Sequence, residues 1–407
     1  MEKTYRYFQP EYVGNFKCDG AKCKAHCCKF WKIFIDKDSR EQYANIEPPE
    51  TAREITSCME LDSERELYAM KLESNGFCPM LTEDNLCRLQ RDYGENFLSI
   101  TCSTYPRITN NFGDFFERAL TLSCPVAAEQ VLFNEESMRF GFVNVSEKIH
   151  SNGDKIRTSE LKVPNSLAER AYEVQGTMIQ ILQERRLTVN QRLIVLGLFL
   201  DTLQEMLHDK ISARELRKLT SAYNPKIFLR DRIPPVIQKV SFRADKFIAL
   251  MLKLFEPIYR ENIKSPQVKR KYFDAVVDML KINSSVSLEE VIENYLSLAD
   301  ARKTFRERYA SFMENYLVNE IFINVYPWKL NASINKNFAV LLATYKLFEL
   351  IIFSATIKGF DSRADLLSMV DWFTRKIDHG QETSKKILEL FKDEDDTWNL
   401  LETLLEQ

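Results

Sequence analysis

Cysteine side chains crowd a short stretch near the start of the chain, between Phe16 and Trp31. Four of the nine cysteines lie within these residues, separated by loops of four, three and zero residues: Cys18, Cys23, Cys27 and Cys28. A single buried cysteine behaves as a small apolar side chain, whereas four close thiols bring four soft ligands into one place. Zinc ions and iron–sulfur clusters are held by thiolates grouped in this way. The spacing therefore predicts a metal or cluster site rather than structural cysteines.

A second set of thiols follows in turn-forming sequence. Cys78 and Cys87 are separated by eight residues that include the turn signal Glu83-Asp84-Asn85, which can bring both sulfurs to one side. A proline follows both Cys78 and Cys124, where it removes an amide donor and fixes the local turn. We therefore expect further ligands downstream, the alternative being scattered core cysteines: Cys78, Cys87, Cys102 and Cys124.

The thiols leave the number and the kind of metal sites open. With Cys58 set aside as an ordinary helix cysteine, eight thiols remain, enough for two four-thiolate sites or for one site with supporting thiols. Adjacent side chains usually point apart, so Cys27 and Cys28 could serve different metals. His26 is expected to face solvent rather than to bind metal. Zinc and iron–sulfur both fit, and the abundance and spread of the cysteines favour iron–sulfur.

Composition excludes several classes of protein. The 11 glycines form neither Gly-x-Gly-x-x-Gly nor a Walker loop, which argues against a Rossmann site for nucleotide or adenosyl groups. The first cysteine group does not match the Cys-x3-Cys-x2-Cys signature of radical adenosylmethionine enzymes. A formal net charge of −3 gives no whole-chain reason to expect nucleic acid. No secretory signal is recognised, and an odd number of cysteines in a long chain predicts a reducing cytoplasm.

The distribution of the cysteines predicts two domains. All nine lie before residue 125, and the rest of the chain has helical patterns without strand-like alternation. We expect a mainly α protein, with a loop-rich Cys-cluster domain at residues 1–150 and an all-helical domain at residues 166–407 that is a candidate for substrate docking. Residues 140–165 are predicted to be the connector.

Several helical segments are predicted individually. Residues 50–74 are predicted to be a helix that contains Cys58, and residues 314–328 a helix that Pro327 ends. Leu193 to Leu200 is apolar all round, as in a helix buried on every side. Three capping boxes are expected to open helices: Ser166 with Glu169, Thr188 with Gln191, and Ser287 with Glu290.

One apolar stretch has nearly the length of a membrane span. Residues 338–357 are interrupted by Lys346 and Glu349, so we predict a core helix and no membrane span.

Charge is distributed unevenly along the helical part. Residues 210–271 carry a net charge of +11, and residues 378–407 carry −6. One interpretation is a basic face that captures an acidic protein or nucleic acid. The favoured alternative is a set of solvated helix faces, with the acidic tail docked against the basic segment.

These residues resemble a known family. Cys18 to Cys28 is similar to the Cys-x(2–4)-Cys-x(2–3)-Cys-Cys domain described as iron- or zinc-chelating. The order of the later pieces resembles the flagellin lysine-N-methylase branch of that family: Phe77-Cys-Pro-Met-Leu, Leu86-Cys-Arg-Leu, Cys102-Ser-Thr-Tyr-Pro-Arg107, Leu122-Ser-Cys-Pro125, and the segment from Glu314 to Trp328 with its Tyr-Pro. Val126 departs from the family, in which an acidic residue commonly follows Cys-Pro.

The resemblance implies an enzyme that methylates lysine ε-amines of flagellin, with S-adenosylmethionine as the expected donor and flagellin as the partner. A lysine ammonium with a pKa of about 10.4 must lose a proton before it attacks a methyl sulfonium, and the sequence names no base for this step. We expect the methionine end of the donor to meet the cluster. Arg107 is a candidate to pair with the donor carboxylate, and Trp31 and Tyr105 are candidate walls for adenine or the substrate lysine. The alternative class is a non-catalytic metal-stabilised binding scaffold or a metal carrier.

Overall fold

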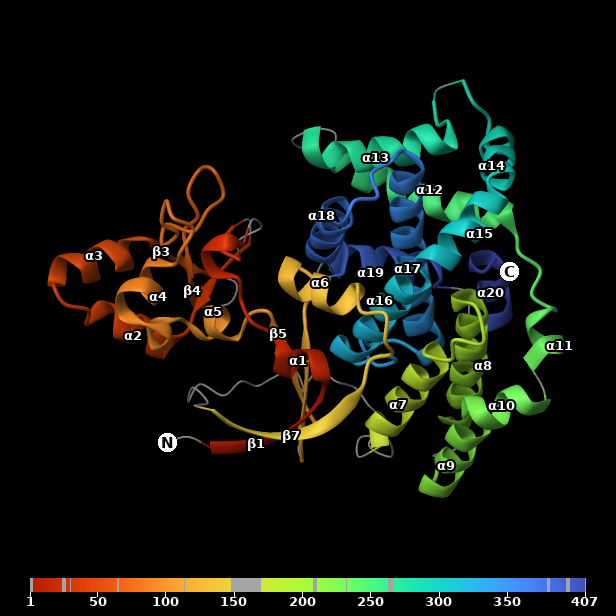
Figure 1. The fold of residues 1–407 in the computed structure, drawn as a ribbon, viewed down its shortest axis with the longest axis horizontal. Helices are drawn as coiled ribbons and strands as arrows, with labels where there is room; N and C mark the ends of the chain where they lie inside the picture. Colours follow the sequence, from red (N-terminus) through yellow and green to blue (C-terminus); the bar gives the residue numbers. More distant parts are fainter. Residues whose placement is uncertain are drawn as a thin grey trace. The chain divides into compact units, whose positions relative to one another are not determined.

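The computed structural model divides the chain into two compact units. It describes residues 3–23, 27–29, 31–63, 66–112, 114–147, 170–207, 211–231, 233–262, 267–283, 285–378, 381–392 and 396–406. One unit comprises residues 1–130 and 139–159, and the other comprises residues 131–138 and 160–407. Helices predominate, as predicted, and the strands lie in the first unit (Figure 1). His26 and the predicted capping box at Ser166 lie outside the described residues.

A four-stranded sheet forms one part of the first unit. Its order is β5-β6-β1-β7, with β1 parallel to β6 and antiparallel to its other neighbour. β1 pairs with β7 along eight residues, so the prediction that residues 140–147 belong to a connector is wrong. The pairing joins segments far apart in the sequence, which local patterns do not reveal. The strands are β1 (Lys3–Pro10), β5 (Arg107–Asn111), β6 (Phe116–Leu120) and β7 (Phe140–Glu147).

A three-stranded sheet forms the other part of the first unit. Its order is β2-β4-β3, from β2 (Phe34–Ile35), β3 (Met59–Asp62) and β4 (Leu67–Met70). The prediction of a helix over residues 50–74 holds only for α3 (Pro49–Ser57) and is wrong beyond it. Cys58 caps that helix, and the next residues form an antiparallel hairpin because Ala69 and Met70 are buried in the core next to β2.

Short helices complete the first unit around these sheets. The structure has α1 (Glu11–Asn15), η1 (Gly20–Lys22), α2 (Lys37–Ala44), α4 (Arg88–Tyr93), η2 (Glu95–Phe97), α5 (Ile100–Thr104) and α6 (Pro125–Leu132), whose last two residues belong to the second unit. Under the three-stranded sheet, one apolar core gathers side chains from α2, α3 and α4, including Tyr43, Ile55 and Leu89.

The second unit is helical in every element described after residue 170. The capping boxes at Thr188 and Ser287 are confirmed, and Ser212 with Glu215 forms a third. The helices are α7 (Ala171–Leu182), α8 (Val189–Leu207), α9 (Ala213–Ala222), α10 (Pro225–Asp231), α11 (Ile233–Ile237), α12 (Ala244–Asn262), α13 (Gln267–Leu280), α14 (Leu288–Ser297), α15 (Ala299–Arg308), α16 (Ala310–Ile323), α17 (Ile334–Ile357), α18 (Arg363–Phe373), the π-helical turn η4 (Thr374–Asp378), α19 (Gln381–Leu390) and α20 (Thr397–Leu404).

The helix α17 is the core of this unit. It packs against α8 and α13, and 94% of its most apolar window is buried inside the protein. It is the one helix of the described residues that is long and apolar enough to cross a membrane, and a buried core helix passes the same test. The helix α16 ends at Ile323, before the predicted Pro327, because Val325 takes a positive φ of 52°.

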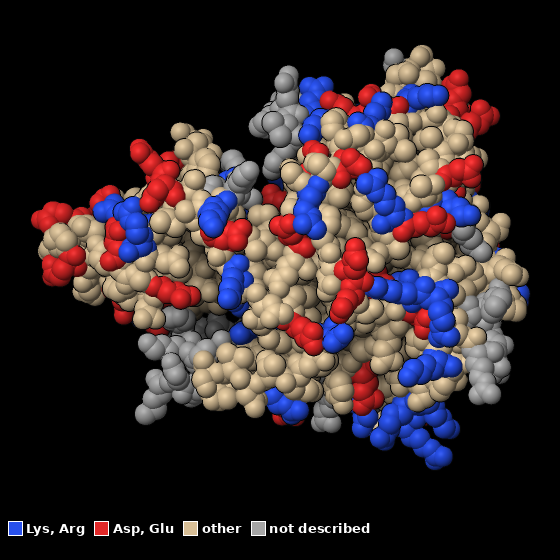
Figure 2. Space-filling view, viewed as in Figure 1, with Lys and Arg blue, Asp and Glu red and all other residues tan. Residues whose placement is uncertain are grey.

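The acidic C-terminal segment packs against part of the basic segment. Arg243 donates its backbone N–H to the carbonyl of Glu402 at 2.8 Å, and the Lys246 ammonium lies 2.9 Å from Oδ1 of Asn399. This contact between α12 and α20 agrees with the favoured interpretation. Figure 2 shows that basic side chains remain crowded elsewhere, over α9.

Candidate thiol-rich site

Five of the predicted ligand thiols gather beside the three-stranded sheet. Cys78 lies in the apolar core of this sheet, Cys28, Cys87 and Cys102 are partly buried and pack against that core, and Cys27 precedes Cys28. The amide of Cys78 donates to the carbonyl of Cys28 at 2.7 Å, which joins the first thiol stretch to the second. Segments far apart in the sequence therefore present one set of thiols.

Residues 78–87 reverse direction, as the turn signal predicts. Leu81 and Cys87 pair across the turn, and the amide of Arg88 donates to the carbonyl of Met80 at 2.7 Å. Asn85 takes a positive φ of 61°, a conformation that asparagine tolerates better than most residues. The reversal brings Cys78 and Cys87 to one side of the hairpin.

Cys102 is positioned by the short helix α5. Asp36 caps α2 and also accepts the amide of Ile100 at 2.9 Å. Thr101 donates its hydroxyl to the carbonyl of Phe34 at 2.8 Å. These bonds fix both the start of α5 and its distance from β2, so the helix holds Cys102 against the core.

The thiols of this group disfavour one another's ionisation. A hydrogen bond with Cys27, followed by burial, raises the pKa of Cys28 far above its ordinary value. Burial first, and then neighbouring thiols, raise the pKa of Cys78 and Cys102 to about 12. Like charges in a poorly solvated place repel each other, and a bound cation would reverse that effect. The group is thus electrostatically suited to a positive ligand.

The other three predicted thiols form a separate group near the four-stranded sheet. Burial and then the thiols of Cys23 and Cys18 raise the pKa of Cys124 to about 12. Cys18 and Cys23 flank η1, and Cys124 precedes α6, whose Gln130 donates to the carbonyl of Tyr12 in α1 at 3.2 Å. The eight thiols therefore divide into a group of five and a group of three.

Several sulfurs accept hydrogen bonds from the backbone. The amide of Gly20 lies 3.4 Å from Sγ of Cys18. Amides also lower the pKa of three further thiols against the larger effect of burial: Met80 at Cys78, Gln90 and Leu89 at Cys87, and Ala127 and Val126 at Cys124. Amide donors stabilise a thiolate and commonly surround the sulfurs of metal sites.

The candidate ligands are of the chemical type that binds zinc or iron–sulfur clusters, because they are free thiols. Every cysteine is free of disulfides, and the predicted ligands span from exposed, as at Cys18 and Cys27, to buried, as at Cys78 and Cys124. Within the part of the chain that the structure describes, no three His, Cys, Asp or Glu side chains converge closely enough to hold one ion. A metal centre therefore remains a proposal.

An aromatic pair lies between the two thiol groups. The rings of Trp31 and Tyr105 are 5.6 Å apart with a tilt of 35°, and the indole N–H of Trp31 donates to the carbonyl of Cys27. The hydroxyl of Tyr105 lies 3.2 Å from that of Ser123, next to Cys124. The structure thus brings together the two aromatic residues that the sequence suggested as walls.

Arg107, the predicted partner of the donor carboxylate, begins β5. Its guanidinium carbon lies 5.3 Å from the centre of the Phe16 ring, two residues before Cys18. This placement puts Arg107 beside the start of the thiol stretch.

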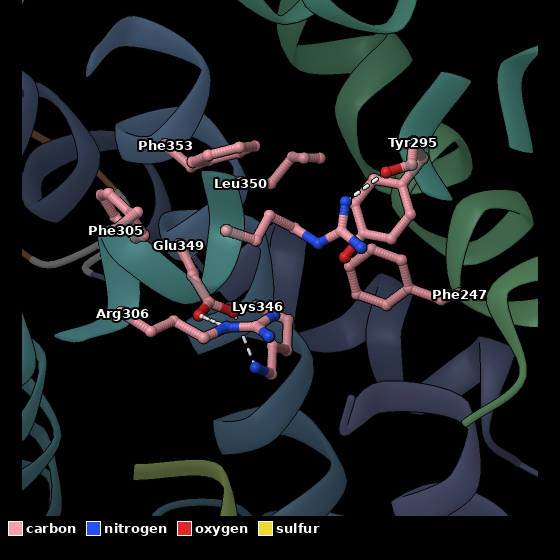
Figure 3. A pocket seen from close by; sticks show the side chains of 9 residues that line it. Phe247, Tyr295, Phe305, Arg306, Lys346, Glu349, Leu350 and Phe353 are labelled. Atoms are coloured by element: carbon pink, nitrogen blue, oxygen red, sulfur yellow. Dashed lines mark hydrogen bonds and ion pairs between the residues drawn. The ribbon is translucent and has the colours of Figure 1, made fainter. Parts of the chain in front are cut away.

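Sequence reasoning missed a buried ion-pair network in the helical unit. Lys346 and Glu349, which seemed only to interrupt an apolar run, pair with each other at 2.7 Å, and Arg306 reaches Glu349 at 2.8 Å (Figure 3). Arg302 and Arg306 also form ion pairs with Glu406. The adjoining cavity is about the size of one water molecule, so this network is structural.

Comparison with known proteins identifies the kind of protein that carries this site. A family model described as the FliB lysine N-methylase C-terminal domain matches residues 175–405. Since this match spans more than half of the chain, the chain belongs to the FliB lysine N-methylase family. The resemblance suggested by the sequence is confirmed.

The curated relatives cover both units. The chain is 23% identical over 399 residues to the lysine-N-methylase of Salmonella typhimurium, which is 93% of each protein. It is 35% identical over 137 residues to the flagellar biosynthetic protein FliU of Salmonella muenchen, covering 33% of this chain and 80% of FliU. No solved structure matches the chain.

Proposed function

We propose that the protein is a protein-lysine N-methyltransferase that modifies flagellin in the cytoplasm. The carrying observation is the match to a protein named lysine-N-methylase over 93% of both chains, which includes the thiol-rich unit as well as the helical one. The name FliU and the family name FliB support flagellin as the partner.

We further propose S-adenosylmethionine as the methyl donor and an iron–sulfur cluster, rather than zinc, as the resident group. Thiolates of the five-thiol group would hold the group, with the three-thiol group as a second or supporting site. A cluster with an open iron would supply a place for the amino and carboxylate ends of the donor. Arg107 would pair with the donor carboxylate, and Trp31 with Tyr105 would provide the aromatic wall.

Co-expression with flagellin tests the activity. Intact-mass analysis should show flagellin heavier by whole methyl units when the chain is present, and unmodified flagellin when it is absent. No mass shift in the presence of a metal-loaded chain would contradict the methyltransferase proposal and favour the binding scaffold or the metal carrier.

The donor proposal has its own test. Anaerobically purified protein should bind S-adenosylmethionine in calorimetry, and Arg107→Ala should weaken that binding by about tenfold while leaving the metal content unchanged. An unchanged affinity would remove Arg107 from the donor site.

A further inference from the structure

The surface of α9 carries cations that form no ion pair with a described carboxylate. Arg214, Arg217 and Lys218 are exposed on this helix, and Lys226 is exposed at the start of α10. Among the described residues, none of these four side chains has an ion pair. Figure 2 shows their helix covered by blue side chains. Unpaired cations on one face raise the local potential, which attracts a negative partner.

The acidic groups nearby are already engaged. Glu215 is held in the capping box by Ser212, with Oε2 2.8 Å from the Ser212 amide. Glu184 pairs with Arg186 at 2.7 Å, and Arg186 remains 61% exposed. Glu184 is therefore engaged away from the four cations, and Glu215 interacts with Lys218 at longer range without forming an ion pair.

An apolar hollow lies beyond the C-terminal end of α9, next to Lys226. It is lined by side chains from α7, α8 and α10 and the segments that join them: Ile181, Glu184, Leu187, Val195, Tyr223, Pro225, Phe228 and Leu229. The hollow has room for about one water molecule, so it would seat only the tip of an apolar side chain. The neighbouring Ile227 is 57% exposed and extends the apolar surface.

We propose that this basic surface and its hollow dock an acidic segment of the protein substrate, with one aliphatic side chain at the hollow. The identification of the partner rests on the proposed methyltransferase function. A polypeptide fits better than nucleic acid, because the cations are few and the nearest of them, Lys226, adjoins a small apolar hollow rather than an extended groove. A bilayer would require more exposed apolar area than one isoleucine provides.

Binding can be measured without turnover. The probe is a fluorescein-labelled nonapeptide with a central leucine between aspartates and glutamates, compared with the same peptide carrying lysines. Fluorescence anisotropy with the full chain should show tighter binding of the acidic peptide, and this binding should weaken as salt rises. The double variant R214E/K218E should weaken it by about tenfold.

A matched control variant distinguishes the effect of this surface on affinity from the effect of the overall net charge. K303E/K385E changes the same number of exposed lysine or arginine charges on α15 and α19, and it should leave the affinity for the acidic peptide unchanged. Equal losses in the two double variants would overturn the proposal. So would equal binding of the acidic and basic peptides, or tighter binding of a single-stranded 20-mer DNA through the same residues.

Methylation kinetics provide the link to the substrate. R214E/K218E should raise the KM for flagellin and leave kcat nearly unchanged, because the surface contributes binding and no reacting group. If the wild-type chain binds the acidic peptide but never methylates flagellin, the methyltransferase proposal is wrong and the docking surface stands. If R214E/K218E methylates flagellin with an unchanged KM, the docking proposal is wrong and the methyltransferase proposal stands.

Discussion

At the scale of single residues, the structure shows which of the predicted ligand thiols lie near one another. The sequence could identify Cys27 and Cys28 as neighbours but could not tell which thiols they join. The contact between the Cys78 amide and the Cys28 carbonyl supplies this information, because it depends on tertiary packing and not on spacing. Cys58, set aside as an ordinary helix cysteine, instead caps α3 and lies in the same core as the five-thiol group.

Cys78 and Cys58 provide a matched test of ligation. We expect Cys78→Ser to lower bound metal by at least about tenfold, because its thiol is buried among the other proposed ligands and receives an amide donor. Cys58→Ser should retain most of the metal. Iron, zinc and labile sulfide measured after anaerobic purification give the answer. Equal loss in both variants would mean that Cys58 is itself a ligand.

The buried carboxylate of Glu349 predicts a pH dependence of stability. Burial alone would raise its pKa, but Arg306 and Lys346 lower the pKa to about 2 from an ordinary 4.5. The unfolded chain therefore binds more protons than the folded chain between these values. The stabilisation is complete above about pH 4.5 and is lost as the pH falls toward 2.

Urea unfolding of Glu349→Gln measures this contribution. The variant should be less stable than the wild type by about 3–5 kcal/mol at pH 7, because it removes the carboxylate that neutralises the buried Lys346 ammonium and leaves Arg306 with Glu406 alone. The difference should shrink as the pH is lowered from 5 to about 3. Glu256→Gln is the control, since its pair with Arg260 is exposed and should contribute less than about 0.5 kcal/mol. A difference that stays constant with pH would contradict the assignment.

At the scale of elements, local signals predicted the helices well and the strands poorly. In the capping boxes at Thr188 and Ser287, both interacting residues lie within four positions of the sequence, so the sequence alone shows both partners. The paired strands β1 and β7 are more than a hundred residues apart in the sequence. Each strand is short, so its local pattern does not distinguish it from a loop or connector. The apolar residues of the hairpin after Cys58 match the helical period as well as the strand period, so the sequence predicts a helix where the structure has strands.

Two helical glycines test how tightly the elements pack. A Cβ at Gly197 in α8 would lie 3.0 Å from Leu401 Cδ2 and from Phe338 Cε1. Both neighbours are buried and have little room to move, so we expect Gly197→Ala to destabilise the protein by about 1–2 kcal/mol.

Gly176→Ala is the counterpart in α7. A Cβ there would meet no heavy atom within 4 Å outside its own stretch of helix, so alanine should stabilise the helix by about 0.5–1 kcal/mol. Chemical denaturation of the two variants under the same conditions compares them directly. Stabilisation by both substitutions would show that the contact between α8 and α17 is looser than the distances indicate.

At the scale of the whole molecule, all of the proposed ligands lie in one unit. The nine cysteines belong to residues 1–130, whereas the unit that contains α17 has none. The second unit buries its own core and its own ion pairs, including Arg192 with Glu314 at 2.6 Å. The first unit instead combines short strands with grouped thiols, whose ionised forms would be stabilised by a bound cation.

Removal of the metal should therefore act on one unit. Chelation of the metal-loaded protein under reducing conditions should increase amide hydrogen exchange in β2, β4 and α5, because their shared core includes the unligated thiols. Exchange in α8, α16 and α17 should change little. Hydrogen-exchange mass spectrometry resolves the two sets of peptides in the intact chain. Equal loss of protection in both sets would show that the units fold as one cooperative body, and it would place the effect of the metal beyond the thiol-rich unit.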